Sequence, residues 1–221
     1  MSELVKIPIA SAEYLARFDR PYIGLLTDAR PKVFEAVVDA LLPFNFRLAN
    51  TEIVTVGNPA EHKVIFRLPD RAIAFEFGAE QYRFTKDQSS WVTASDDVQV
   101  LRAAQRALLD GSGAKIALST VTIAMHMQPL VKPREQILAP FLPEPFKNLM
   151  AERKVQTFGN HLKWADGDVL LDFSLALANG IFVRLSSQFQ GQPPLEEMLT
   201  KIRNDEKTLF GILGVEEATN A

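Results

Sequence analysis

Four side chains in the second half of the chain could take part in chemistry together: His161, Asp172, Arg184 and Ser186. If Asp166-Gly167 forms a two-residue hairpin turn, His161 lies opposite Asp172, and the next hairpin places Asp172 opposite Ser186. A serine hydrolase uses the same residue types, but its histidine stands between the serine and the carboxylate. Here the carboxylate would stand in the middle. We therefore expect this row, with Arg184 diagonal to Asp172, to bind a polar or anionic group.

An enzymatic use of the same residues stays open as an alternative. In a small-molecule hydrolase or lyase, His161, Asp172 and Arg184 would act as acid, base and anion clamp. The test is whether the three side chains converge in a concave site. Because no G-x-S-x-G motif occurs, the sequence favours a binding module over an enzyme.

The same face is expected to carry Lys163 and His126 as contacts for a ligand or partner. His126 lies between two methionines on a predicted strand, where it is either a structural histidine or a ligand contact. The three histidines are scattered and the chain has no cysteine, so no metal site is predicted. Neither G-x-x-x-x-G-K-[ST] nor G-x-G-x-x-G occurs, and no cofactor is expected.

The strands that would position these residues are indicated by alternating side chains. In the first half, residues 62–68 and 71–77 alternate between apolar and polar, which is typical of half-buried strands. Two-residue turns at Pro69-Asp70 and Gly78-Ala79 would place Phe75 opposite Tyr82. Every apolar residue would then meet an apolar one across each hairpin, so the pattern predicts both the faces and the register.

The predicted elements occur twice, about 100 residues apart. Strands predicted at 22–28 and 121–128 each lead into a helical stretch. Adding 100 to Val37, Val38, Leu41 and Leu42 gives Ile137, Leu138, Phe141 and Leu142. Each half then has four strand-like runs, including one at 154–159, and a closing amphipathic helix. The expected organisation is a lead-in at 1–20 with a short helix at 11–18, repeats at 21–113 and 114–214, and a frayed tail at 215–221.

The element order β-α-β-β-β-β-α in each half resembles, in topology, the duplicated saddle of the TATA-binding protein and the wider helix-grip group. The resemblance covers residues 21–213 and rests on element order. It implies an α+β fold, in which a curved antiparallel sheet carries its helices on one face and leaves the other face open. Function does not follow from such a resemblance, and the net charge of −3 opposes a DNA-binding role.

The predicted open face is mildly basic. Its charged residues are five bases against two acids, a local charge of +3: Lys63, Arg67, Arg83, Lys163 and Arg184 against Glu76 and Asp172. Nucleic-acid binding by this face is therefore a second alternative, which the charge of the whole chain disfavours.

The composition is that of a globular protein with a sizeable core, because 47% of the 221 residues are apolar. No run of about 18 uncharged apolar residues predicts a membrane span. The N-terminal MSELVKIPIA has an acid and a proline where a signal peptide needs an apolar run. We expect a cytoplasmic, bacterial-type binding or interaction module that uses the open sheet face or the groove between the repeats. Its partner would be a small molecule or a protein, with a homodimer as one possibility.

Overall fold

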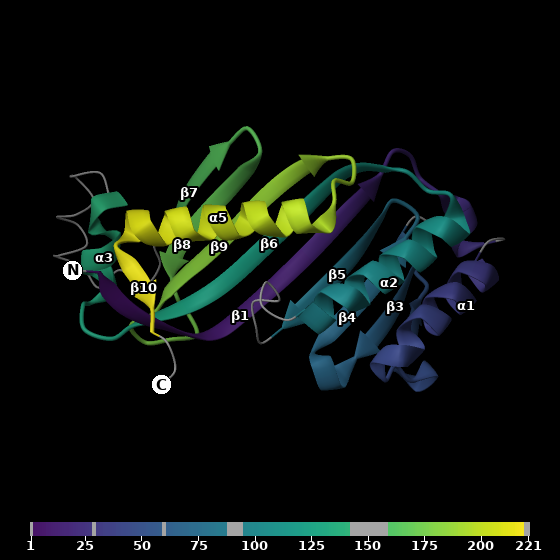
Figure 1. Cartoon of the computed structure of the whole chain (residues 1–221), viewed down its shortest axis with the longest axis horizontal. Helices are drawn as coiled ribbons and strands as arrows, with labels where there is room; N and C mark the ends of the chain where they lie inside the picture. Colours follow the sequence, from purple (N-terminus) through teal and green to yellow (C-terminus); the bar gives the residue numbers. More distant parts are fainter. Residues whose placement is uncertain (1, 28–29, 59–60, 88–94, 142–158, 219–221) are drawn as a thin grey trace. The chain divides into compact units, whose positions relative to one another are not determined.

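The computed structural model describes residues 2–27, 30–58, 61–87, 95–141 and 159–218, and it shows an α+β protein with a large antiparallel sheet (Figure 1). The strands are β1 (Glu3–Phe18), β2 (Thr51–Val54), β3 (Lys63–Leu68), β4 (Ile73–Gly78), β5 (Gln81–Asp87), β6 (Ile116–Pro129), β7 (Gly159–Trp164), β8 (Gly167–Phe173), β9 (Ile181–Gln190) and β10 (Val215–Glu217). The α-helices are α1 (Arg30–Leu41), α2 (Ser95–Ser112), α3 (Arg134–Leu138) and α5 (Leu195–Leu213). Within these ranges, no helix has the length and apolar character needed to cross a membrane.

The chain forms two compact units whose segments alternate along the sequence. Unit 1 comprises Met1–Ala10, Thr122–Ser187 and Leu199–Ala221, and unit 2 comprises Ser11–Val121 and Gln188–Met198. The elements β1, β6, β9 and α5 each contribute residues to both units. Because the units interleave along the sequence, they do not test the repeat boundaries expected at 113 and 214, which stay a prediction.

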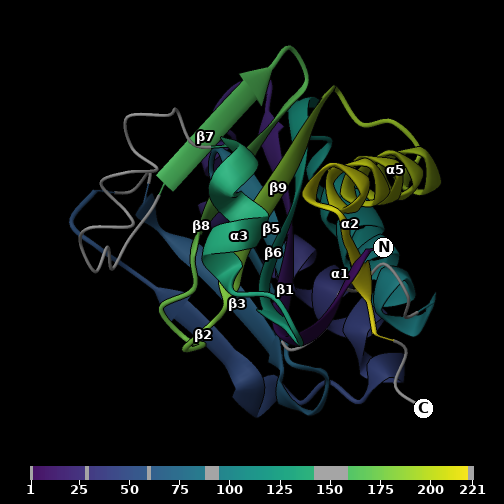
Figure 2. The same ribbon diagram turned by 90° about the vertical axis from the view of Figure 1, so that its left-hand side faces the viewer.

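In unit 2 the strands run in the order β2-β3-β4-β5-β1, and one face of these strands is apolar. Alternate residues point to that face, where the following are buried: Val64, Phe66, Leu68, Ile73, Phe75, Phe77, Tyr82 and Phe84. Helices α1 and α2 lie on one side of these strands (Figure 2). The two helices approach closely at Gly111, where a side chain would come within 3.3 Å of the Val33 side chain.

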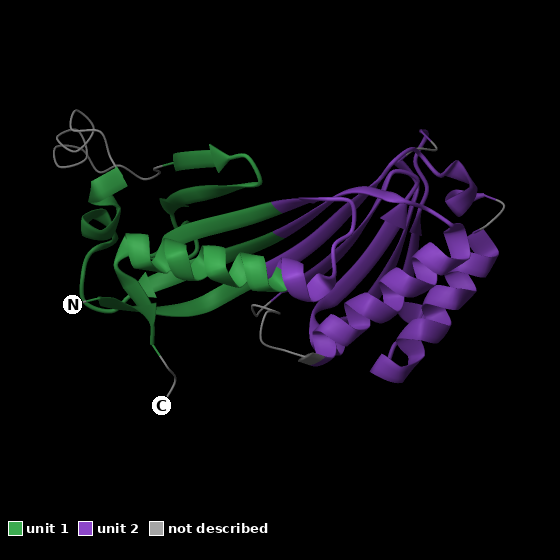
Figure 3. Ribbon diagram, turned by 45° about the horizontal axis from the view of Figure 1, so that its top comes forward, with its two compact units in different colours: residues 1–10, 122–187, 199–221 green, residues 11–121, 188–198 purple. Residues whose placement is uncertain are grey.

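In unit 1 the strand order is β1-β6-β9-β8-β7, and β10 pairs with β1 in parallel. Helix α5 lies along the strands of this unit (Figure 3). It is tied to them by Asp205, which accepts a hydrogen bond from Ser187 Oγ at 2.8 Å. Lys201 Nζ lies 2.8 Å from an Asp205 carboxylate oxygen and 3.2 Å from a carboxylate oxygen of Asp166, which is in the β7–β8 turn. The helix is thus fixed to a strand and a turn as well as to the apolar face.

The expectations for both ends of the chain are wrong. Residues 1–20 contain the strand β1 and no helix, and residues 215–217 form β10 where a frayed tail was expected. The strand predicted at 22–28 is a 3-10 turn over Ile23–Leu26. β1 is hard to detect because its buried positions include Ala12 and Ala16, whose small side chains give a weak alternating pattern.

The hairpin faces of the first half are as predicted, but the register is wrong by two residues. Phe75 lies opposite Phe84, and Tyr82 lies opposite Phe77. In this hairpin the turn is Ala79-Glu80, one position later than predicted. The turn before β4 is also longer than predicted, since it ends with Ala72 in the left-handed conformation, at φ 52°. A shift of two residues keeps each side chain on its face, so the predicted core is retained.

The closing helices expected in the two halves are present as α2 and α5. α2 begins at Ser95 and is followed by Gly113 at φ 65°, while α5 begins directly after Pro193-Pro194. Two predicted features fall outside the described residues: the strand at 154–159, of which the structure describes only Gly159, and Leu142 of the second helical stretch.

Candidate functional site

The structure brings His161 and Arg184 together around a carboxylate, which belongs to Asp168. Asp168 Oδ1 lies 3.5 Å from His161 Nε2 and 3.8 Å from Arg184 Nη2. This oxygen is buried and accepts no hydrogen bond from the residues that the structure describes. The side chains of His161 and Arg184 are 51% and 45% exposed, so both bases remain accessible from solvent.

Asp172 does not face His161, which corrects the predicted pairing. Leu170 lies opposite His161, because the turn is one position earlier than Asp166-Gly167. Gly167 belongs to β8, where a side chain would come within 2.5 Å of a backbone oxygen of β9. Asp172 instead accepts a hydrogen bond from the next backbone N–H at 2.6 Å.

A second correction follows from the end of β8 at Phe173, four residues earlier than predicted. Ser174 Oγ accepts the backbone N–H groups of the second and third residues after it, at 3.2 and 3.0 Å, and so folds the chain into a loop. The longer loop moves the register of β9. Ser186 therefore lies opposite Asp168, whereas the sequence predicted Asp172 as its partner.

Ser186 takes part in a polar row, but the row has no nucleophilic relay. Its Oγ lies 3.1 Å from Thr122 Oγ1 of the neighbouring strand β6. On its other side, Ser186 is opposite Asp168, and His161 contacts Asp168 from β7. The carboxylate lies between serine and histidine, so this histidine is not placed to take the serine proton.

Lys163 completes a basic cluster on this face of unit 1. It is exposed and lies opposite Asp168 in the β7–β8 register. His161 and Arg184 thus lie near one carboxylate, and Lys163 is the cross-strand neighbour of the same residue; we call these three bases and Asp168 the Asp168 cluster. At 3.8 Å, Arg184 Nη2 is beyond hydrogen-bonding distance of Asp168 Oδ1, so its N–H donors can bind another acceptor.

His126 lies on the same face of unit 1 but makes a structural contact. Its Nδ1 lies 2.7 Å from Ser174 Oγ, and its ring packs against Phe182 with centroids 5.0 Å apart. Because Ser174 already accepts two backbone N–H groups, its hydroxyl donates to Nδ1, which places the imidazole proton on Nε2. Burial lowers the pKa of His126 below its ordinary value and favours this neutral form.

On the open face of unit 2, the three bases that the sequence placed there are all paired with carboxylates, whereas the sequence predicted an excess of positive charge. The ion pairs are Lys63–Glu76 at 3.0 Å, Arg83–Glu76 at 3.6 Å, Arg83–Glu13 at 3.4 Å and Arg67–Glu52 at 3.0 Å. Glu13 was missed because residues 1–20 were not assigned to the sheet. The positive charge of Lys63, Arg67 and Arg83 is therefore compensated locally, which weakens the case for phosphate binding by these residues.

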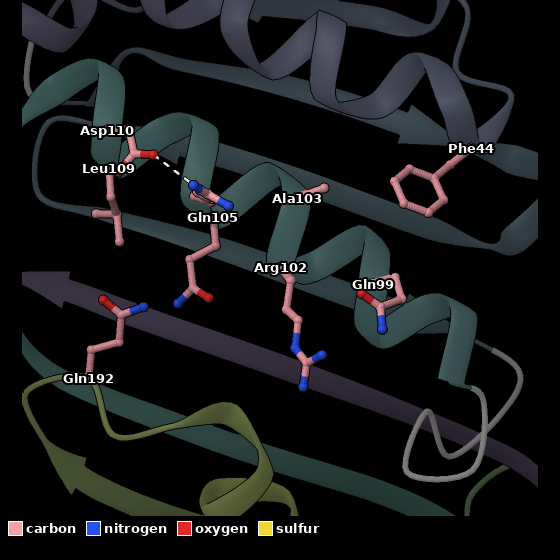
Figure 4. A pocket seen from close by; sticks show the side chains of 9 residues that line it. Phe44, Gln99, Arg102, Ala103, Gln105, Leu109, Asp110 and Gln192 are labelled. Carbon is pink, nitrogen blue, oxygen red and sulfur yellow. Dashed lines mark hydrogen bonds and ion pairs between the residues drawn. The ribbon is translucent and has the colours of Figure 1, made fainter.

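A cavity of about 610 Å³ lies beside α2 in unit 2 (Figure 4), and none of the predicted site residues lines it. Its lining consists of Phe44, Gln99, Arg102, Ala103, Gln105, Arg106, Leu109, Asp110 and Gln192. Polar residues along a helix normally indicate a solvated side, and for this reason the site was not predicted from the sequence. One signal was present: Gln105 occupies the apolar stripe of α2, four residues after the buried Leu101.

Within the described ranges, no group of three or more histidine, aspartate or glutamate side chains could bind a metal ion.

No protein-family model and no curated protein matches the chain. Among solved structures, one described as the crystal structure of an unknown protein from Galdieria sulphuraria aligns over 92% of this chain and 94% of its own, at 12% identity and a TM-score of 0.20. A TM-score this low supports no conclusion about fold or function. The function must therefore be inferred from the geometry of the chain itself.

Proposed function

We propose that the protein is a binding module that uses the Asp168 cluster to bind a carboxylate-bearing segment of a partner protein. The observation behind this proposal is the gathering of His161, Lys163 and Arg184 around a single carboxylate. On the face of unit 2, by contrast, the corresponding bases are already paired. An additional carboxylate at the Asp168 cluster would meet free N–H donors from at least one guanidinium group and one ammonium group.

A protein segment fits this surface better than a small ligand. The residues of the Asp168 cluster lie on strands, and the side chains of His161 and Arg184 are about half exposed. Small ligands are bound mainly in concave sites that bury most of their surface, whereas polar, solvated surfaces are common in protein–protein contacts.

We also infer that the fold arose by duplication of a β-α-β4-α unit, as in the TATA-binding-protein saddle. The strand orders support this: β1-β5-β4-β3 in unit 2 corresponds to β6-β9-β8-β7 in unit 1. Each series is followed by a long helix, α2 or α5. The correspondence begins with β1 and β6, so the first repeat would include residues that were expected to be a lead-in.

The two alternatives have less support. A hydrolase or lyase needs its acid, base and clamp in one place, but Asp172 does not join His161 and Arg184. Ser186 is hydrogen-bonded to Thr122 and lies across the carboxylate from the histidine. Nucleic-acid binding has less support because Lys63, Arg67 and Arg83 of unit 2 are each paired with a carboxylate.

The proposal is tested with a fluorescent glutamate-rich peptide, whose binding is followed by anisotropy. Arg184→Gln and Lys163→Gln should each weaken binding about tenfold, because each removes a charge-assisted contact. Asp168→Asn should tighten binding, since it removes the carboxylate that competes with the peptide. Rising salt should weaken all of these complexes.

Arg67→Gln serves as the matched control, because Arg67 is an equally exposed base of a sheet face but is paired with Glu52. It should leave peptide binding unchanged, and the melting temperatures of all variants should stay close to that of the wild type. Equal losses in Arg67→Gln and Arg184→Gln, or binding that Asp168→Asn weakens, would overturn the proposal. Sedimentation would show whether a second copy of the chain is the partner.

A further inference from the structure

We propose that the α2 cavity of unit 2 is a second site, which binds a small hydroxycarboxylate. The ligand hydroxyl group would donate a hydrogen bond to Gln105, and its carboxylate would pair with Arg102. This site lies in a different unit from the Asp168 cluster, and the proposal does not rest on the function proposed above.

A one-way chain of hydrogen bonds fixes the orientation of Gln105. The carbonyl of Gly191 can only accept, so Ser119 donates to it, at 2.8 Å. Ser119 then has no proton left, and it accepts from Tyr14 at 3.1 Å. Tyr14 in turn accepts from Tyr82 at 3.3 Å. Because the Tyr82 proton is used in that bond, Tyr82 must accept from its partner at 2.6 Å, which is therefore the amide nitrogen of Gln105. The same nitrogen also donates to Tyr14 at 3.2 Å.

This orientation leaves the carbonyl oxygen of Gln105 as an acceptor beside the cavity. Ser119, Tyr14 and Tyr82 are fully buried, and Gln105 is 7% exposed, yet it contributes to the cavity lining. No described residue donates to its Oε1. This acceptor is therefore available to a ligand in the cavity that carries an O–H or N–H group.

Arg102 supplies the positive charge next to this acceptor. It lies on α2, one turn before Gln105, and both side chains extend from the helix toward the same side (Figure 4). Its partner in the structure is Glu196, whose side chain is 63% exposed, while that of Arg102 is 39% exposed. An exposed ion pair of this kind is weak, so a ligand carboxylate can replace Glu196.

The remaining lining matches a short polar carbon skeleton. Phe44 and Leu109 provide apolar contact, and the side-chain amides of Gln99 and Gln192 provide further donors and acceptors. Gln192 directly follows Gly191, the residue that ends the hydrogen-bond chain. A volume of about 610 Å³ is within the usual range for small-molecule sites.

The experiment compares L-malate with succinate, which lacks only the hydroxyl group, by calorimetry at millimolar ligand, fixed pH and matched sodium concentration. Malate should bind about fivefold more tightly than succinate, which is the value of one hydrogen bond. Arg102→Gln should weaken both ligands by at least about tenfold, because each carries carboxylates. Gln105→Met should abolish the preference for malate.

Arg203→Gln is the control, since Arg203 is an exposed base of α5 that does not line the cavity. It should leave malate binding unchanged. If Gln105→Met does not fold, the comparison of malate with succinate in the wild type still decides the role of the hydroxyl group. No binding of malate, equal affinities for the two acids, or the same loss in Arg102→Gln and Arg203→Gln would overturn the proposal.

Discussion

Ser174 and His126 show how two residues that are common in active sites can be used for structure alone. The serine oxygen accepts two backbone N–H groups and donates its proton to the imidazole. Neither of its lone pairs is free to attack a substrate. The pair closes the loop after β8 and thereby helps to determine which aspartate, Asp168 or Asp172, lies opposite Ser186 of β9.

A pH dependence follows from the environment of His126. Burial lowers its pKa in the folded protein, while the unfolded chain keeps an ordinary value of about 6.5. The unfolded state therefore binds the proton more readily, and the stability contributed by neutral His126 is present above about pH 6.5 and is lost as the pH falls toward the folded pKa. We expect the wild type to lose more free energy of unfolding than His126→Gln between about pH 8 and pH 5.

The measurement is urea unfolding of both proteins across this pH range. Glutamine can still accept the Ser174 proton through its amide oxygen but does not titrate. Identical pH profiles for the two proteins would show that His126 does not titrate differently in the folded state.

For individual residues, the sequence predicted the face of the sheet correctly but the cross-strand partner wrongly. His161, Lys163 and Arg184 are on the face where alternation placed them, because each register shift was an even number of residues. Asp172 was the wrong partner because the β7–β8 turn lies one position earlier than predicted and the β8–β9 loop, which Ser174 folds, is longer. Both changes depend on contacts with neighbouring strands or loops, which local patterns do not show.

Among the elements of unit 2, α2 is joined to the sheet by a buried ionic contact at its first turn. Asp97 lies 2.8 Å from Lys86 Nζ of β5 and 3.4 Å from Arg71 Nη1. The side chains of Asp97 and Lys86 are 7% and 11% exposed, and Lys86 also donates to the carbonyl of Arg71 at 2.8 Å. This contact fixes the start of the helix over β5.

Removing one charge from this contact should be strongly destabilising. Asp97→Asn leaves Lys86 buried without its counter-ion and should cost about 3–5 kcal/mol of unfolding free energy. Lys86→Met combined with Asp97→Asn should cost less than the two single changes together, because no buried charge is left unpaired. Urea unfolding measures each value.

Asp110→Asn on the same helix is the control. Its pair with Arg106 has side chains that are 73% and 85% exposed, so the loss should stay below about 1 kcal/mol. If Asp97→Asn and Asp110→Asn lowered the free energy of unfolding by similar amounts, the buried pair would have no special role in stability.

Alternation and turn signals were sufficient for most elements but not for β1 or β10. The strands β3, β4 and β5 have large apolar residues at every second position, so their faces could be read directly. β1 uses alanines at buried positions, and β10 is only three residues long, Val215–Glu217. Short or small-residue strands are stabilised by pairing with neighbours rather than by their own composition.

For the molecule as a whole, the two units are not contiguous pieces of chain. Besides residues 11–113, unit 2 contains residues 114–121 and 188–198, which lie beyond the repeat boundary expected at 113. Those two segments supply Ser119 and Gly191, the last members of the buried hydrogen-bond chain. Neither unit can therefore be excised by a single cut at the boundary expected from the repeats.

A fragment of residues 1–113 should consequently fail to unfold cooperatively. It lacks β6, the neighbour of β1, and leaves the Tyr14 hydroxyl without its acceptor. Urea unfolding followed by circular dichroism should show a broad, non-cooperative change in the fragment and a sharp transition in the full chain. A fragment with the same midpoint as the full chain would show instead that the first repeat folds alone.

The hydrogen-bond chain from Gln105 to Gly191 also has a spectroscopic consequence. Its hydroxyl protons are shielded from water, since Tyr14, Tyr82 and Ser119 are fully buried, and they should exchange slowly enough to give separate proton resonances. Neighbouring bonds in such a chain polarise one another. A group that bonds to the Gln105 carbonyl would strengthen the amide N–H as a donor, and the change would pass to Tyr82, Tyr14 and Ser119. The tyrosine hydroxyl resonances would then report from the core whether the cavity is occupied.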